Sequence, residues 1–273
     1  MTSKTPSATP AAGQSAPLWR LLQATASAVQ AVRQGQSLTA QLERVPQELR
    51  PGVQSLSFQV LRQLGRATAL REQLAAKAPP PAADALLCSA LALCWNDADA
   101  PYPVHTLVNQ AVEAARQQHQ TKAQSGFINA CLRRFMRERD ALIAKTDANP
   151  LAQWNHPRWW IERLQADHPD HWQDLLNLAQ QAAPMTLRVN RQHHSVAQYQ
   201  AQLQAQGLAA KPVGQDGLQL AQAVPVHQLP GFAQGHVSVQ DAAAQVSARL
   251  LMQGMDTQKP WRILDACAAP GGK

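Results

Sequence analysis

The 273-residue sequence contains no apolar run long enough to span a bilayer, and the longest, residues 85–95, is typical of a buried helix. Residues 1–17 contain one lysine but no apolar block, which excludes a secretory signal. No CxxC pair occurs, which disfavours a disulfide framework or a zinc site. We therefore expect a cytoplasmic protein with reduced thiols, no metal and no membrane segment. The cysteines are Cys88, Cys94, Cys131 and Cys267.

Charged residues are also few, at 16% of the sequence, but they are unevenly distributed. The net charge is +7. Residues 1–150 carry 16 basic and 10 acidic side chains, whereas residues 151–273 carry 9 and 8. Between Arg116 and Lys145, seven basic residues face only Glu138 and Asp140. A local excess of this kind attracts polyanions, most commonly nucleic acid, although a solvated helix face would have the same composition.

Hydrophobic spacing predicts helices from residue 18 to about residue 145. Prolines at 79–81, 101 and 103 mark helix boundaries within this region. Residues 1–17 are rich in Ser, Thr, Pro and Ala and are expected to be a disordered tail. We expect a bundle of six or seven helices over residues 18–148.

The predicted helix at residues 126–137 has two different faces. Its apolar residues fall on one half of the helical wheel, and Arg133, Arg134 and Arg137 fall on the other half. Core packing accounts for the apolar half. The three arginines are candidate phosphate contacts.

Residues 149–183 form a predicted helical connector that holds four tryptophans. Indole rings in such a segment either stack on bases or, more commonly, pack a small pair of helices. The sequence leaves both interpretations open. The tryptophans are Trp154, Trp159, Trp160 and Trp172.

After Pro184 the pattern becomes that of an α/β region. Strands are predicted at residues 185–190, 217–221, 236–240 and 261–265, with helices at 195–206 and 242–252. Ser195 is the expected N-cap of the first helix and Gly207 its C-cap. Asp241 is an expected cap of the second.

The last predicted strand ends at Asp265 and enters a turn of small residues, ACAAPGGK. Glycine lets a ligand approach the backbone closely, and the carboxyl end of a strand is where doubly wound sheets bind nucleotides. The turn matches neither the P-loop pattern nor G-x-G-x-x-G. From these residues alone, an ordinary connection between strand and helix stays open.

Four segments resemble the RNA 5-methylcytosine methyltransferases. DACAAPGGK (residues 265–273) is similar to the S-adenosylmethionine motif of that family, and PMTLRVN (184–190) and GHVSVQDAAAQ (235–245) are similar to segments before it. YPVHTLVNQAVEAAR (102–116) and SGFINACLRRF (125–135) are similar to the NusB-like helical domain fused to one bacterial branch. The resemblance covers nearly the whole chain from about Leu18.

The resemblance implies a multidomain protein: an all-α NusB-like RNA-binding bundle (18–148), a helical connector (149–183), a small α/β region (184–255), and the first strand and cofactor loop (256–273) of an incomplete Rossmann-like methyltransferase domain. It implies S-adenosylmethionine as cofactor and small-subunit ribosomal RNA as partner, with methylation at cytosine C5. Arg188 becomes a further candidate RNA contact. The implied cofactor contacts are Cys267, Ala268, Ala269, Pro270, Gly271, Gly272 and Lys273.

Family members attack cytosine C6 with a cysteine thiolate, and a second cysteine assists product release. Both belong to motifs downstream of the cofactor loop, so we expect a truncated chain that holds no catalytic residue and transfers no methyl group. A non-catalytic NusB-like module for RNA binding and transcription antitermination is the alternative function. That module would not need residues 184–273.

Overall fold

The computed structural model describes residues 16–98, 100–256 and 258–266. The chain forms two compact units, Met1–Gln181 and Ala182–Lys273, which we call the helical unit and the sheet unit. The helices of the helical unit are α1 (Leu18–Arg33), α2 (Leu38–Glu43), α3 (Arg50–Arg62), α4 (Leu64–Leu74), α5 (Pro81–Cys94), α6 (Val104–Gln117), α7 (His119–Lys122), α8 (Ser125–Asp147), α9 (Pro150–Trp154), α10 (Arg158–Asp167) and α11 (Trp172–Ala179).

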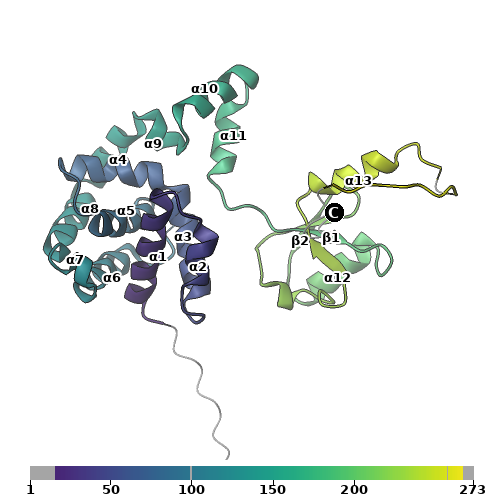
Figure 1. The fold of residues 1–273 in the computed structure, drawn as a ribbon, viewed down its shortest axis with the longest axis horizontal. Coiled ribbons are helices and arrows are strands. Elements are labelled where there is room, and N and C mark those ends of the chain that lie inside the picture. The colour runs from purple at the N-terminus through teal and green to yellow at the C-terminus, as the bar shows by residue number, and fades with distance from the viewer. Residues whose placement is uncertain (1–15, 99, 257, 267–273) are drawn as a thin grey trace, which may run out of the picture. The chain divides into compact units, whose positions relative to one another are not determined.

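Helix α5 forms the centre of the helical unit, and α1, α3, α4, α6 and α8 pack around it (Figure 1). Every residue of α5 from Ala83 onward is buried, as expected of a helix that is apolar nearly all round. Pro81 lies in its first turn and Pro103 immediately precedes α6, so both predicted boundaries are confirmed. The described part of residues 18–148 contains eight helices, because the single-turn α7 adds to the six or seven expected.

One charged residue, Asp84, is buried inside this apolar helix. Its side chain is only 8% exposed. Its carboxylate accepts a hydrogen bond from Arg33 Nη1 at 2.7 Å, and its other oxygen lies 2.8 Å from Nε of the buried Arg71. The three side chains tie α1, α4 and α5 together through an ion cluster within the core.

The four tryptophans of the connector form one packed pair and one exposed pair. Trp154 is buried and packs edge-to-face on Trp172, with ring centroids 5.2 Å apart. With Ile161 and Leu176 they form a small core between α9, α10 and α11. Trp159 and Trp160 lie on the outside of α10, 66% and 40% exposed.

The described part of the sheet unit contains four antiparallel strands in the order β2-β3-β1-β4. The α/β region that we expected is therefore an antiparallel sheet with helices. Ser195 and Gln198 form a capping box at the start of α12, so the predicted N-cap is confirmed. The C-cap is Gln206, one residue before the predicted Gly207, which has the left-handed φ of +75° that is common just after a helix. The elements are β1 (Thr186–Val189), α12 (Val196–Ala205), β2 (Ala210–Val213), β3 (Gly217–Leu220), η1 (Val226–Gln228), β4 (Val237–Val239) and α13 (Ala244–Met252).

Helix α12 and one face of the sheet share a core in which Leu187, Tyr199 and Leu218 are fully buried. The sequence analysis did not predict β2. This strand contains Pro212, which cannot donate a ladder hydrogen bond, and it lies at the edge of the sheet, where the lost donor is tolerated. Asp241 accepts a hydrogen bond from Ala243 N at 2.8 Å, but the N-cap of α13 is Ala243, so the cap predicted at Asp241 is wrong.

The strand predicted at residues 261–265 is wrong for this structure. These residues have no regular secondary structure, and Leu264 is 87% exposed. A strand needs a neighbour that accepts and donates its backbone hydrogen bonds, and the described sheet offers these residues none. The first strand of a Rossmann-like domain is therefore not confirmed.

Candidate nucleic-acid interface

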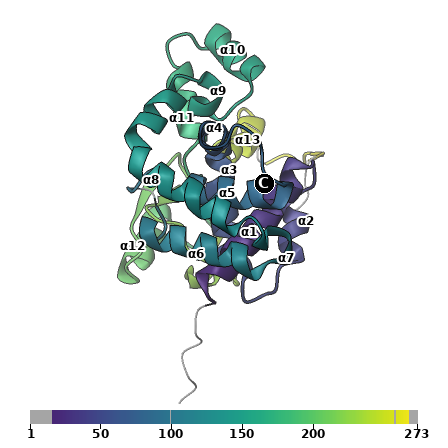
Figure 2. The same cartoon turned by 90° about the vertical axis from the view of Figure 1, so that its left-hand side faces the viewer.

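Arg133 and Arg137 lie one turn apart on the exposed side of α8. The apolar side of the helix, including Ile128, Leu132 and Phe135, is buried against the rest of the helical unit, so the predicted amphipathic helix is confirmed. Both arginines line the same surface hollow, together with residues of α6. Figure 2 shows α6 and α8 lying side by side. The two cations therefore present one positive stripe to solvent.

Arg134 differs from its neighbours in what it contacts. Its Nε donates a hydrogen bond to Glu138 at 3.0 Å, and its Nη1 lies 3.5 Å from the carbonyl of Gln73 on α4. The nearby Arg139 has a structural role, because it donates hydrogen bonds to the carbonyls of Cys94 and Trp95 at the end of α5. The structure thus brings Arg133 and Arg137 together, whereas Arg134 is partly neutralised by Glu138.

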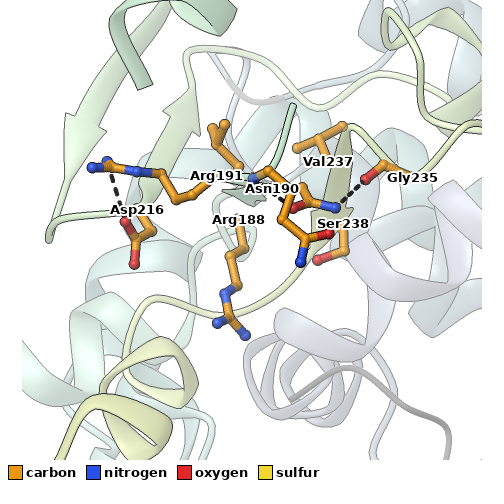
Figure 3. A pocket seen from close by; sticks show the side chains of 9 residues that line it. Arg188, Asn190, Arg191, Asp216, Gly235, Val237 and Ser238 are labelled. Atoms are coloured by element: carbon orange, nitrogen blue, oxygen red, sulfur yellow. Dashed lines mark hydrogen bonds and ion pairs between the residues drawn. The ribbon is translucent and has the colours of Figure 1, made fainter. Parts of the chain in front are cut away.

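Arg188, the candidate from the sheet unit, lies on β1 between two neighbouring strands. It is opposite Gly217 of β3 and Ser238 of β4. Because side chains alternate along a strand, Arg188 faces away from the core that Leu187 and Val189 enter. It lines an open hollow of about 490 Å³ together with Asn190, Arg191 and Asp216 (Figure 3).

Two contacts hold the rim of this hollow. Asn190 Nδ2 donates to the carbonyl of Gly235 at 3.0 Å, and Arg191 pairs with Asp216 at 3.3 Å. Arg188 points away from that ion pair, and among the described residues it has no acidic partner (Figure 3). A half-buried arginine without a counter-ion favours an anionic ligand such as a phosphate. The family resemblance pointed to Arg188 but not to Asp216, which lies in the turn between β2 and β3.

Three histidines pack together next to the start of β4. His194 Nε2 and His236 Nδ1 are 3.1 Å apart, and the rings of His193 and His236 stack with centroids 4.7 Å apart. Gly231, with φ +65°, lies against His236, where a Cβ atom would be 2.1 Å from the ring. Desolvation and the neighbouring His193 and His194 lower the pKa of His236.

The cysteines of the helical unit are buried in its core. Burial raises the pKa of Cys88 to about 11 and that of Cys94 to about 12, and it also raises the pKa of Cys131. A thiol of this kind is neutral at physiological pH and a poor nucleophile. The interpretation of these three cysteines as core residues is confirmed.

The predicted cofactor contacts at residues 267–273 lie outside the described residues. In the part of the chain that the structure describes, no helix is long and apolar enough to cross a membrane. Within the same ranges, no group of three or more His, Cys, Asp and Glu side chains is arranged to hold a metal ion.

Two family models match the chain. The NusB family model matches residues 20–137, and a model described as "Methyltr_RsmF/B-like, ferredoxin-like domain" matches residues 156–227. The first match covers most of the bundle, and the second includes β1, β2 and β3. The chain therefore contains a helical NusB-like domain and a small ferredoxin-like sheet region.

Curated relatives match most of the chain. It is 37% identical to a Vibrio cholerae protein over 92% of its length and 39% identical to a Pseudomonas putida protein over 92%. It is 36% identical to an Escherichia coli O6:H1 protein over 89%. Each relative is named "Ribosomal RNA small subunit methyltransferase B". The chain spans 57–58% of their lengths.

A solved structure has the same fold. The crystal structure of PH0851 matches with a TM-score of 0.54 at 14% identity, over 85% of this chain and 55% of the other. At that identity, the likeness concerns the fold alone.

Proposed function

The chain is a homologue of the ribosomal RNA small subunit methyltransferase B proteins, and from this premise we propose that it serves in methylation of small-subunit ribosomal RNA. The proposed reaction moves a methyl group from S-adenosylmethionine to C5 of a cytosine. The homology over 92% of the chain is the observation that carries this proposal. We further propose that the protein acts in the cytoplasm.

The proposed division of labour follows the segments of the chain. Residues 18–148 bind RNA, and residues 149–183 connect this bundle to the small α/β region at residues 184–255. That region forms the N-terminal part of the methyltransferase region. Residues 256–273 begin the Rossmann-like cofactor domain and contribute the methyl-donor contacts. The support for the donor contacts is the motif DACAAPGGK together with the methyltransferase relatives.

The cysteine chemistry of the proposed reaction has a structural constraint. The attacking group must be a thiolate that reaches a base, whereas Cys88, Cys94 and Cys131 are buried in the helical unit with raised pKa values. We therefore assign none of these three thiols to catalysis. A preparation of residues 1–273 alone is expected to transfer no methyl group to ribosomal RNA. Turnover above a control without protein would contradict this expectation.

Four arginines are the proposed RNA contacts. Arg133 and Arg137 form the exposed stripe of α8, Arg134 lies beside it, and Arg188 faces the hollow on the sheet unit. Each phosphate that an arginine neutralises releases counter-ions, so binding weakens as salt is added. The positive stripe and the hollow are thus expected to act as phosphate contacts.

The test measures binding of the chain to small-subunit ribosomal RNA across a range of salt concentrations. Joint replacement of Arg133, Arg134 and Arg137 by Ala should weaken binding and flatten the slope of log K against log salt by about 2. Arg44→Ala is the matched control, since Arg44 is an exposed arginine of the helical unit outside the stripe. An unchanged slope in the triple variant would show that these side chains are only solvated.

A non-catalytic RNA-binding and antitermination module is the second candidate, and the NusB family match favours it. The ferredoxin-like match at residues 156–227 favours the methyltransferase, because a binding module of the NusB type has no use for that region.

A further inference from the structure

A furrow on the helical unit combines positive charge with an exposed aromatic ring. Two adjoining hollows share His105 and Met136 and so form one depression between the start of α6 and the middle of α8. We call this depression the α6–α8 furrow. Its principal residues are Tyr102, His105, Asn109, Arg133, Met136 and Arg137.

The charge of the furrow comes from Arg133 and Arg137. Arg133 donates from Nε to Asn129 Oδ1 at 3.1 Å. The residue is exposed, and it has no acidic partner among the described residues. Asp97, the acidic residue that lines the furrow, is paired with Arg139 at 2.6 Å. The furrow therefore keeps a net positive charge that suits a polyanion.

Tyr102 is the exposed aromatic residue of the furrow. It is 38% exposed and stands between Pro101 and Pro103 in the segment before α6. Each proline fixes its own φ, so the backbone that carries the ring has little freedom to lose on binding. Met136, 39% exposed, adds an apolar surface beside it.

We propose that the α6–α8 furrow binds a single-stranded segment of RNA, with Arg133 and Arg137 on its phosphates and Tyr102 stacked on a base. This inference rests on the proposed function only in taking RNA as the polyanion. Stacking on a side chain requires an unpaired base, because the bases of a duplex already stack on one another. The two arginines are about 6 Å apart along the helix axis, so they can hold phosphates of one strand.

The experiment uses the full chain and two fluorescent RNAs of mixed sequence, a single strand of about 12 nucleotides and a blunt-ended duplex of similar length. Fluorescence anisotropy gives the affinity for each. Wild-type protein should prefer the single strand. Tyr102→Ala should weaken single-strand binding by about 5- to 100-fold and leave the salt slope unchanged. Tyr102→Phe, which keeps the ring, should bind as wild type does.

Joint replacement of Arg133 and Arg137 by Ala should flatten the single-strand salt slope by about 1.4, whereas Arg44→Ala should not. Circular dichroism confirms that each variant is folded. Single-strand binding by Tyr102→Ala equal to that of wild type would overturn the inference while RNA binding by the arginines stands. Equal affinity for the blunt-ended duplex would also overturn it. If the wild-type chain binds neither RNA, the RNA-binding part of the proposed function fails as well.

Discussion

Replacement of Asp84 by Ala should strongly destabilise the helical unit. Asp84 is the charged residue within the buried helix α5, and its carboxylate balances Arg33 and Arg71. The side chain of Arg71 is 10% exposed, so without Asp84 its charge would stay buried. Its other acidic neighbour, Glu72, is 3.6 Å away and 60% exposed.

The magnitude follows from this burial. Removal of one partner from a buried ion pair costs about 3–5 kcal/mol, because the remaining charge is left uncompensated. Arg33 adds little to this loss, because its side chain is 31% exposed and can regain water. The expected loss of unfolding free energy for Asp84→Ala is therefore about 3–5 kcal/mol.

The assay is urea unfolding of the full chain followed by far-ultraviolet circular dichroism at neutral pH. A loss of this size should lower the midpoint by about 1–2 M urea. Arg20→Ala is the matched control, because Arg20 and Glu48 form an exposed pair at 3.9 Å, and its expected cost is below about 1 kcal/mol. Equal midpoints for Asp84→Ala and Arg20→Ala would refute the reasoning.

Three further predictions concern other contacts. Because burial raises the pKa of Cys88 to about 11 and that of Cys94 to about 12, the unfolded chain loses these protons first. The unfolding free energy should fall by about 1.4 kcal/mol per pH unit and thiol above about pH 9, and Cys-to-Ala variants should lose this alkaline sensitivity in urea titrations. Because the pKa of His236 is lowered in the folded chain, its contribution to stability is present above about pH 6.5 and is lost as the pH falls through the pKa of the folded state. Proton NMR should give a pKa below 6.5 for this ring, and an unshifted pKa would contradict the packing of the three histidines. Asn155, with φ +55°, accepts from Gly65 N at 2.6 Å and donates to Leu61 O at 3.0 Å, so Asn155→Ala should cost about 2–4 kcal/mol. Asn155→Gly, which tolerates the left-handed backbone, should cost less, and equal losses by thermal unfolding would show that the backbone conformation is unimportant.

Most helices of the bundle could be predicted because their hydrophobic spacing is long and regular. The prolines at 81 and 103 then fix where α5 and α6 begin. The capping box of Ser195 marks the start of α12 equally well. These signals depend only on residues close together in the chain, so a single sequence is enough to read them.

The elements that depend on distant neighbours were harder to predict. Strand β2 has only four residues with no apolar alternation, and its partner β3 makes it a strand. Residues 261–265 are apolar enough for a strand, but no described strand lies beside them. Backbone pairing, which the composition of one segment does not reveal, decides both cases.

The candidate site shows the same limit. The helical wheel places Arg133, Arg134 and Arg137 on one half of α8, but Glu138 and the end of α4 separate Arg134 from the other two. The α6–α8 furrow unites residues 102–109 with residues 133–137, and no spacing rule joins those segments. Arg188 was found through its motif, whereas the ion pair of Arg191 and Asp216 required the folded sheet.

The most direct test of the central claim examines ribosomal RNA from the cells that encode this chain. Small-subunit RNA from cells with and without the gene is compared by bisulfite sequencing, which detects 5-methylcytosine. The account predicts that a 5-methylcytosine of the small subunit disappears with the gene and returns when the gene is restored. An unchanged set of methylated cytosines in the deletion strain would contradict it.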